Sequence, residues 1–328
     1  MSSKILIVGG AGFIGSNVNK LLNKKGYQTV IFDNLSKGCR DTVVCGSFVK
    51  GDLANTNEID QVLQSQTFNA VMHFAAWTDV GESVANPDEY YQNNVVNTLN
   101  LLRSMLKHNI KNFIFSSSAA VYGNPQTTPI SEAHPCHPIN PYGFTKLMVE
   151  QILKDLERAY GLHYCSFRYF NAAGGDPDGE IKNHKKKENN LIPLALKSLL
   201  DPKGSITVYG SDYATSDGTC IRDYIHVSDI GDAHISGMER LFSGAPSATY
   251  NLGNGQGYSV KEVLKAVESV TGRQLNIING ERRAGDPPIL VADAGKACSE
   301  LQWHPKYPKI ERMVEDAWNT TMRTTCTN

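Results

Sequence analysis

The chain lacks any apolar run long enough to cross a bilayer, and it lacks a surplus of charge of either sign. Among its 328 residues, 32 are Lys or Arg and 33 are Asp or Glu, which gives a formal net charge of −1. Such a balance provides no electrostatic footprint for nucleic acid or for a membrane surface, so we expect neither partner. An anionic ligand must therefore be bound by local features of a site.

The chain also lacks a Cys-x-x-Cys pair. Its seven cysteines are odd in number and scattered, which favours reduced thiols in a cytoplasmic enzyme over a disulfide framework. The first residues are typical of a buried strand and not of a secretory signal. His134, Cys136 and His137 are possible metal ligands, but the prolines around them and the lack of a second ligand cluster favour an ordinary loop. We expect no metal site.

The first half of the chain contains a regular alternation of two kinds of segment. Short β-branched runs predict strands at residues 4–8, 28–32, 47–49, 70–74, 112–115 and 163–168. Helical periodicity lies between them, at residues 14–25, 58–64, 87–107 and 141–160. This alternation predicts an α/β fold with a Rossmann-type doubly wound parallel sheet and helices on both faces.

Beyond Asn171 the pattern loosens, because Gly, Pro and Asn become frequent. Shorter elements follow, including predicted helices at residues 260–271 and 310–322. We therefore expect a first domain over residues 1–171 and a smaller, irregular α/β lobe over residues 172–328. The boundary is approximate, and segments of the second half can return to the first domain.

A glycine-rich turn directly follows the first predicted strand. It reads Gly9-Gly10-Ala11-Gly12-Phe13-Ile14-Gly15 and opens a helix, so the backbone can approach a pyrophosphate at the helix N-terminus. The second strand ends at Asp33, eighteen residues past Gly15. A carboxylate there accepts hydrogen bonds from a ribose diol and repels a 2′-phosphate, which favours NAD over NADP. Asp52, just after the third strand, is a less specific candidate for a place near the adenine.

Three polar residues form a candidate catalytic set. Ser118 follows a central strand, at the sheet edge where doubly wound folds bind ligands. Tyr142 and Lys146 are four apart on one predicted helix, so their side chains lie one turn apart. A cation there would lower the pKa of Tyr142 from its usual value of about 10 towards neutrality, which suits a general base.

The alternative is an ordinary helix with Lys146 extending beside Tyr142, and Tyr-x-x-x-Lys alone is too common to exclude it. The combination with Ser118 and the glycine turn favours catalysis.

The glycine turn, Ser118, Tyr142 and Lys146 together resemble the extended short-chain dehydrogenase/reductase superfamily. Longer blocks narrow the resemblance to the UDP-glucose 4-epimerase family, from about residue 4 to about residue 318: residues 73–76, 80–83, 90–94, 116–123, 146–150, 168–171, 221–227 and 250–253.

The resemblance implies a reaction with tightly held NAD. Tyr142 takes the proton of the sugar 4-hydroxyl while the C4 hydride passes to NAD; the 4-keto sugar then turns over, and hydride returns to its other face. Ser118 assists Tyr142, and Lys146 tunes Tyr142 and holds the nicotinamide ribose. Residues 1–171 would bind NAD and carry these three residues, and residues 172–328 would mainly bind the UDP-sugar.

The resemblance also implies two sets of binding residues. For NAD they are Gly9, Gly12, Phe13, Ile14, Gly15, Asp33, Asn34, Asp52, Leu53, Phe74, Ala75, Ala76, Asn93, Ser116, Tyr142, Lys146 and Phe170. For the UDP-hexose they are Ser118, Tyr142, Asn171, Asn190, Leu191, Tyr209, Arg222, Arg283, Asp286 and Leu290. Without the resemblance, Arg222 and Arg283 are more typical of surface salt bridges.

Some positions depart from the family pattern. Thr78 stands where many members have a lysine near the cofactor, and residues 179–188 differ from the usual glycine- and acid-rich loop, so we assign neither a role. Leu290 stands where a tyrosine restricts the pocket to glucose and galactose. Because leucine leaves more space, we expect that UDP-N-acetylglucosamine is also accepted.

Three other functions remain open at this point. A nucleotide-sugar 4,6-dehydratase needs an Asp-Glu pair where this chain has Ala119 and Ala120, so it is disfavoured. A UDP-glucuronate epimerase or decarboxylase differs in its acidic substrate. A non-catalytic NAD-binding regulator usually loses the tyrosine or the lysine, and this chain keeps both. From the resemblance we expect a homodimer, paired through helices 87–107 and 141–160.

Overall fold

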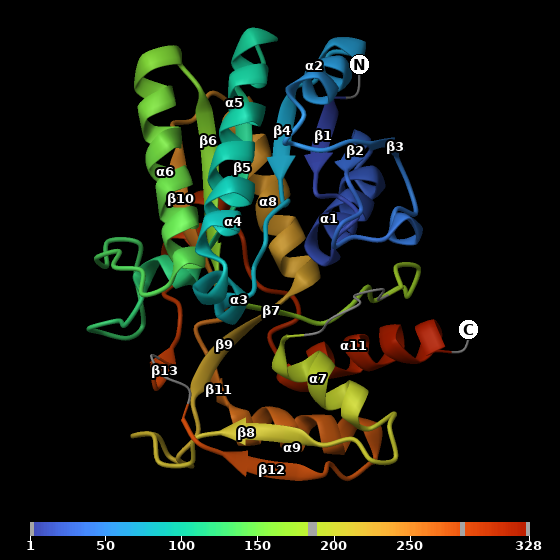
Figure 1. Cartoon of the computed structure of the whole chain (residues 1–328), viewed down its shortest axis with the longest axis vertical. Helices are drawn as coiled ribbons and strands as arrows, with labels where there is room; N and C mark the ends of the chain where they lie inside the picture. Colours follow the sequence, from blue (N-terminus) through green and yellow to red (C-terminus); the bar gives the residue numbers. More distant parts are fainter. Residues whose placement is uncertain (1–2, 183–188, 283–285, 326–328) are drawn as a thin grey trace.

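In a computed structural model of the chain, residues 3–182, 189–282 and 286–325 are described. Their main feature is a seven-stranded parallel sheet with the strand order β10-β6-β5-β4-β1-β2-β3 (Figure 1). Its strands are β1 (Lys4–Val8), β2 (Gln28–Asp33), β3 (Ser47–Lys50), β4 (Ala70–His73), β5 (Asn112–Ser118), β6 (His163–Tyr169) and β10 (Ala248–Leu252). The predicted doubly wound parallel sheet is confirmed.

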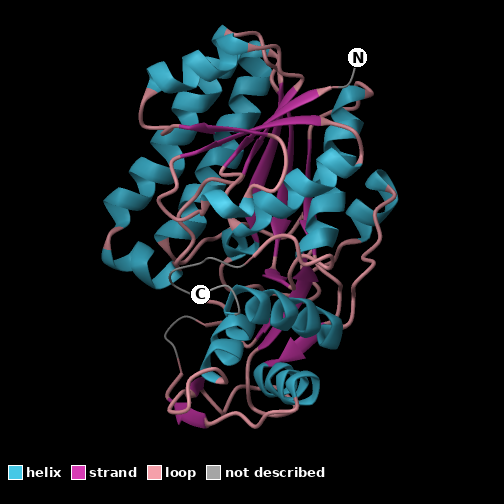
Figure 2. Cartoon of the chain, turned by 90° about the vertical axis from the view of Figure 1, so that its right-hand side faces the viewer, coloured by secondary structure: helices cyan, strands magenta, loops and turns pink. Residues whose placement is uncertain are grey.

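Helices cover both faces of this sheet (Figure 2). One face packs against α1 (Phe13–Lys24), α8 (Val227–Phe242) and α10 (Gly295–Leu301). The other packs against α2 (Thr56–Ser65), α5 (Asn97–Lys107) and α6 (Pro141–Tyr160). Alternate residues of each strand supply the two cores: Ile5 and Ile7 belong to the first core, and Leu6 and Val8 belong to the second.

The predicted helix over residues 87–107 is interrupted in the structure. It consists of α4 (Pro87–Tyr91), a π-helical turn η2 (Gln92–Val96) and α5. A short helix, α3 (Val80–Ala85), precedes it, and two 3₁₀ turns, η1 (Arg40–Thr42) and η3 (Ala119–Tyr122), follow β2 and β5. Single π turns occur mostly at functional sites, and this one carries a predicted cofactor residue, Asn93.

The second half of the chain forms a smaller lobe below the sheet (Figure 1). One small sheet contains β7 (Asn171–Ala173), β9 (Ile221–His226), β11 (Gly257–Ser259) and β13 (Ile289–Leu290), and another pairs β8 (Ile206–Tyr209) with β12 (Ile277–Gly280). A separate core joins them to α7 (Leu191–Ser198), α9 (Val260–Thr271) and α11 (Ile310–Thr325).

Three elements from beyond residue 171, β10, α8 and α10, complete the main sheet layer. β10 pairs with β6 at the sheet edge, and α8 packs on α1 and on strands β5 and β6. The helices predicted at 260–271 and 310–322 are present as α9 and α11. Across the described ranges, which omit residues 183–188 and 283–285, no helix is both long and apolar enough to span a bilayer.

Candidate active site

A cavity of about 1160 Å³ lies between the sheet and the smaller lobe, at the carboxyl ends of β1, β2, β4, β5 and β6. Parallel strands of doubly wound folds bind ligands at this edge. The residues that line it include Gly9 after β1, Asp33 at the end of β2, Phe74 after β4 and Ser118 at the end of β5. Arg222 of the smaller lobe lines it as well. The volume suits two ligands side by side better than one small molecule.

The glycine turn forms a cradle at one end of the cavity. A Cβ atom on Gly9 would lie 2.4 Å from the backbone nitrogen of Ala75, and one on Gly15 would lie 2.4 Å from the carbonyl oxygen of Gly9. Gly12 instead faces open space, since a Cβ there would meet only that carbonyl, at 3.4 Å. Gly12 is the N-cap residue of α1 and no side chain caps the helix, so the helix N-terminus is accessible to an anion.

Two carboxylates stand beside the cradle. Asp33 Oδ2 accepts a hydrogen bond of 3.0 Å from the Ala11 N–H, and Oδ1 accepts one of 2.8 Å from the Leu35 N–H. Burial raises the pKa of Asp33, and these two bonds lower it. Asp52 accepts a 2.9 Å hydrogen bond from the side chain of Asn34, and all three polar residues line the cavity. This arrangement provides oxygen acceptors for a ribose diol.

The segment after β4 is fixed by a residue that sequence reasoning missed. Asn94, in the π turn, accepts a 2.9 Å hydrogen bond from the Trp77 N–H and donates one of 2.9 Å to the Trp77 carbonyl. It also donates to Thr145 Oγ1 on α6, at 3.1 Å. Asn94 therefore joins the segment that carries Phe74, Ala75 and Ala76 to the helix that carries Tyr142. The polar run at residues 92–94 has no sequence signal for a π turn.

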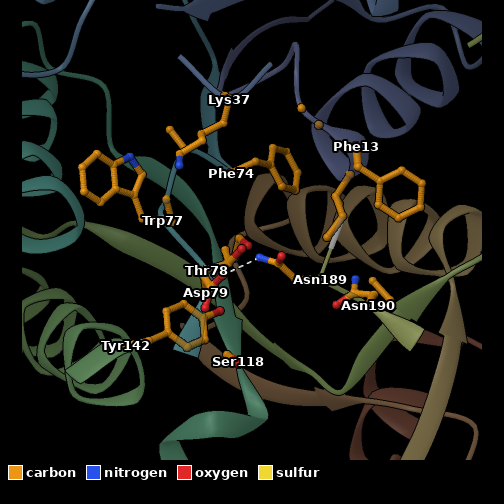
Figure 3. Close-up of a pocket in the computed structure, with 18 of the residues that line it drawn as sticks. Phe13, Lys37, Phe74, Trp77, Thr78, Asp79, Ser118, Tyr142, Asn189 and Asn190 are labelled. Carbon is orange, nitrogen blue, oxygen red and sulfur yellow. Dashed lines mark hydrogen bonds between the residues drawn. The ribbon is translucent and has the colours of Figure 1, made fainter. Parts of the chain in front are cut away.

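The three candidate catalytic residues line this cavity, and Figure 3 shows Tyr142 beside Ser118. Tyr142 is 8% exposed and is hydrogen-bonded to Ser118. Asn140 caps the start of α6 by accepting a 2.9 Å hydrogen bond from the Gly143 N–H, which places Tyr142 in the first helical turn. Lys146, one turn later, donates a 2.8 Å hydrogen bond to the Ser116 carbonyl. A hydroxyl pair and a buried amine thus share one wall of the site.

The electrostatics differ from the expectation for Tyr142. Burial raises the pKa of Tyr142, and only the hydrogen bond from Ser118 lowers it. The Lys146 Nζ lies 5.9 Å from the centroid of the Tyr142 ring, and burial lowers the pKa of this amine to about 7. The net effect is a raised pKa of Tyr142, because burial outweighs the neighbouring groups and the charge of the poorly solvated Lys146 is itself weakly held.

Most of the predicted binding residues line this one cavity. On the cofactor side these are all seventeen predicted positions: Gly9, Gly12, Phe13, Ile14, Gly15, Asp33, Asn34, Asp52, Leu53, Phe74, Ala75, Ala76, Asn93, Ser116, Tyr142, Lys146 and Phe170. On the substrate side they are Ser118, Tyr142, Asn171, Asn190, Arg222, Asp286 and Leu290. Arg222 Nη2 donates a 2.7 Å hydrogen bond to Asp286, so the two residues form one charged pair at the wall.

Three predicted substrate residues are not placed there. Leu191 packs against the core of the smaller lobe, because it starts the apolar face of α7. Tyr209, on β8, is 41% exposed and does not line the cavity. Arg283 lies outside the described residues, as does most of the 179–188 loop.

The cavity wall contains residues that were not predicted. Asp79, from the segment after β4, accepts a 2.6 Å hydrogen bond from Asn189 of the smaller lobe (Figure 3). Lys37 lies with its Nζ 5.3 Å from the centroid of the Trp77 ring. Thr78 lines the cavity beside them. In the described part of the chain, no group of three His, Cys, Asp or Glu residues could hold a metal ion.

Comparisons with known proteins agree with this geometry. The model of the NAD dependent epimerase/dehydratase family matches residues 5–253. A UDP-glucose 4-epimerase of Halalkalibacterium halodurans is 46% identical over 315 residues, which is 96% of this chain and 94% of the relative.

Two solved structures are also similar. One is a UDP-glucose 4-epimerase from Brucella ovis in complex with NAD, with a TM-score of 0.94, 44% identity and coverage of 97% of this chain and 98% of that one. The other is a UDP-glucose 4-epimerase from Bifidobacterium longum in complex with NAD⁺ and UDP, with a TM-score of 0.92, 38% identity and coverage of 98% and 99%.

Proposed function

The chain belongs to the NAD-dependent epimerase/dehydratase family, and on that premise we propose that it is a UDP-glucose 4-epimerase that interconverts UDP-galactose and UDP-glucose with tightly bound NAD. One observation carries the proposal. The Tyr142–Ser118 pair, the buried Lys146 and the glycine cradle face the same cavity, which also reaches Arg222 of the smaller lobe. A proton acceptor, a dinucleotide site and a diphosphate-binding cation are thus brought together.

The residues present fit NAD. The open N-terminus of α1 and the bare Gly12 suit the diphosphate, and Asp33 suits the adenosine ribose. Lys146, which lines the same cavity, suits the nicotinamide ribose. When bound, NAD supplies the acceptor for the C4 hydride and a positive nicotinamide ring that favours the phenolate form of Tyr142.

Side chains of the protein accept the proton and return it. The Tyr142 phenolic oxygen accepts the proton of the sugar 4-hydroxyl, and Ser118 Oγ stabilises the same sugar oxygen by a hydrogen bond. Burial of Tyr142 limits the access of water to this transfer. Tyr142 returns the proton after the keto sugar has turned over. Such a cycle needs a tight hold on the nucleotide and a loose hold on the hexose.

The smaller lobe supplies that hold on the nucleotide. The Arg222 guanidinium, oriented by Asp286, suits the diphosphate as a forked donor. Asn171 and Asn190 line the same cavity and can bind hydroxyl groups.

The direct test is incubation of the purified protein with UDP-galactose and no added NAD, followed by chromatography of the nucleotide sugars. We expect UDP-glucose to form up to a fixed equilibrium ratio. A protein that leaves UDP-galactose unchanged, or that acts only on UDP-glucuronate or releases a dehydrated 4-keto-6-deoxy sugar, would be a different enzyme of the family or a non-catalytic NAD-binding protein.

A wider substrate range is supported by Leu290. This residue is half-buried, lines the cavity and packs beside Phe170 at the core of the 119–130 segment. Leucine occupies less space than tyrosine and has no hydroxyl, so this position leaves more space for an N-acetyl group than a tyrosine would. UDP-N-acetylglucosamine and UDP-N-acetylgalactosamine are therefore proposed as further substrates.

A homodimer in the cytoplasm is the proposed state of the enzyme. Phe144 and Met148, one turn apart on α6, are 44% and 45% exposed, and Val96 at the end of η2 is 43% exposed. Apolar groups of this size on neighbouring helices suit a pairing surface. Sedimentation of the protein and of Met148→Glu tests this, since the charge should shift a dimer towards monomer. The six described cysteines are free thiols, which suits a reducing compartment.

A further inference from the structure

Lys20 is a charged residue on the buried face of α1, the helix that begins at the glycine cradle. Its side chain is only 5% exposed. Its Nζ donates hydrogen bonds of 2.7 Å to both carboxylate oxygens of Asp176 and lies 2.8 Å from Asp178 and 3.0 Å from Glu180. Burial lowers the pKa of Lys20, but the three carboxylates raise it more, so the amine stays charged. A buried charge with this many partners holds its neighbours in place.

All three carboxylates come from one segment of the second half of the chain, residues 174–182. Asp176 organises this segment, because its Oδ2 also accepts hydrogen bonds from the backbone N–H groups of Glu180, at 2.7 Å, and Ile181, at 3.0 Å. The segment is closely packed on its other side against α11, since a Cβ on Gly175 would lie 2.3 Å from Thr320 Oγ1. It is therefore held between α1 and α11.

Both parts that Lys20 joins belong to the cavity wall. Gly175, Asp176 and Ile181 line the cavity from the 174–182 segment. Ser16 and Asn17 line it from α1, one helical turn before Lys20 and on the same face of the helix. Lys20 thus connects the helix of the glycine cradle to the segment that closes the same end of the cavity.

We infer that Lys20 and Asp176 form a latch that retains the dinucleotide: the ion pair holds the 174–182 segment against α1, and the segment keeps the cofactor in the cradle between turnovers. Lys20 is a positioning residue, because it acts through the segment and not on a reacting atom. The inference rests on the proposed function, in which the cofactor is regenerated within each cycle and gains nothing by leaving.

The chain offers a matched control one turn along the same helix. Lys24 also binds Asp178, but its side chain is 53% exposed, so solvent screens that pair. Lys20→Met, Asp176→Asn and Lys24→Met are each loaded with NAD and passed through a desalting column. NAD per chain is then measured by absorbance, together with its release rate when excess ADP-ribose is added. Asp176→Asn keeps an oxygen for the Glu180 and Ile181 N–H groups, so it tests the charge with the least disturbance of the segment.

We expect Lys20→Met and Asp176→Asn to release NAD at least about tenfold faster than the unchanged protein, a difference of about 1.4 kcal/mol. Lys24→Met should release it at the original rate. Added NAD in excess should recover the conversion of UDP-galactose that Lys20→Met and Asp176→Asn lose after desalting, and Lys24→Met should keep nearly the original kcat with or without it.

The latch is overturned if folded Lys20→Met or Asp176→Asn releases NAD at the original rate. It is also overturned if Lys24→Met releases NAD as fast as the other two variants. Should Lys20→Met fail to fold, Asp176→Asn decides. NAD release is measured without the sugar, so a failure of the latch is distinct from a failure of the epimerase assay.

Discussion

Arg168 binds Glu150 through two parallel hydrogen bonds, of 2.9 Å from Nε to Oε1 and 2.6 Å from Nη2 to Oε2. Neither side chain is more than 6% exposed. Glu150 lies one turn after Lys146 on α6 and is the group that raises the pKa of that lysine against the effect of burial. Arg168 donates in addition to the Tyr122 hydroxyl, at 2.9 Å, so the pair fixes the catalytic helix to β6 and to the segment after β5.

This pair predicts a large loss of stability when one partner is removed. Glu150→Gln leaves the Arg168 guanidinium buried without a counter-charge, which costs about 3–5 kcal/mol in comparable cases. We expect a decrease of that order in the free energy of unfolding, measured by urea denaturation. Gln151→Ala, a change on the exposed side of the same turn, should alter it by less than about 0.5 kcal/mol. Equal stability of the two variants would contradict the argument.

Replacing the phenol of the active site should abolish most of the activity and little else. Tyr142→Phe removes the proton acceptor, so we expect kcat for UDP-galactose to fall by about 10²–10⁴-fold. NAD content and the unfolding midpoint should stay close to those of the unchanged protein. The control is Tyr160→Phe, at the exposed end of the same helix. Undiminished conversion by Tyr142→Phe would show that another group takes the proton.

The size of residue 290 should control acceptance of N-acetylated sugars. Leu290→Tyr places a ring in the space proposed for the acetamide, so turnover of UDP-N-acetylgalactosamine should fall by about tenfold or more. Turnover of UDP-galactose should change much less, because its 2-hydroxyl needs less room. The ratio of the two kcat/KM values is the measurement. If the variant lowers both equally, Leu290 supports the site in general and does not select the sugar.

Stability should fall in mild acid because of buried histidines. Burial lowers the pKa of His234 from 6.5 to about 4, so as the pH falls below 6.5 the unfolded chain binds the proton first. This contribution to stability is fully present above pH 6.5 and is lost progressively as the pH falls towards 4. We expect His234→Leu to show a weaker pH dependence of the unfolding free energy in this window.

The matched control for that measurement is His137→Leu, at an exposed position. It shows how much any replacement of a histidine by leucine changes the measured slope. Identical slopes for His234→Leu and the unchanged protein would mean that His234 does not titrate as its burial implies. Burial lowers the pKa of His73 to about 3, so His73 would then be the next histidine to replace.

The first half of the fold could be predicted closely from the sequence, because each strand and helix there carries its own local pattern. The predicted helix at residues 141–160 has the bounds of α6, and the glycine turn and Ser118 lie where strand ends place them. α8 was missed for a physical reason. Gly231 and Gly237 weaken its helical signal. A Cβ on Gly231 would lie 2.5 Å from Leu21, and a Cβ on Gly237 would lie 2.6 Å from Phe167. The close packing of α8 requires these two glycines, and the same glycines make the helix hard to recognise from the sequence.

The residues of the site could be predicted where they belong to a sequence motif. They could not be predicted where their role depends on contacts between distant parts of the chain. The positions of Ser118, Tyr142 and Lys146 followed from their spacing. The ion pair of Lys20 with Asp176 joins residues 156 apart, and the contacts of Asn94 depend on a π turn. No local sequence pattern predicts the ion pair or the contacts of Asn94. The direction of the Tyr142 pKa was wrong because spacing reveals a neighbouring charge but not the loss of water around it.

The edge position of β10 has a consequence for the order in which the chain can fold. Two of the three helices that cover one face of the main sheet, α8 and α10, and the edge strand β10 are synthesised after residue 226. A nascent chain that ends near residue 171 would expose Cys165 and Phe167, which the finished protein buries completely. The dinucleotide-binding layer therefore cannot close before residues 227–252 have been synthesised, and one apolar face of the sheet stays available to a chaperone until then.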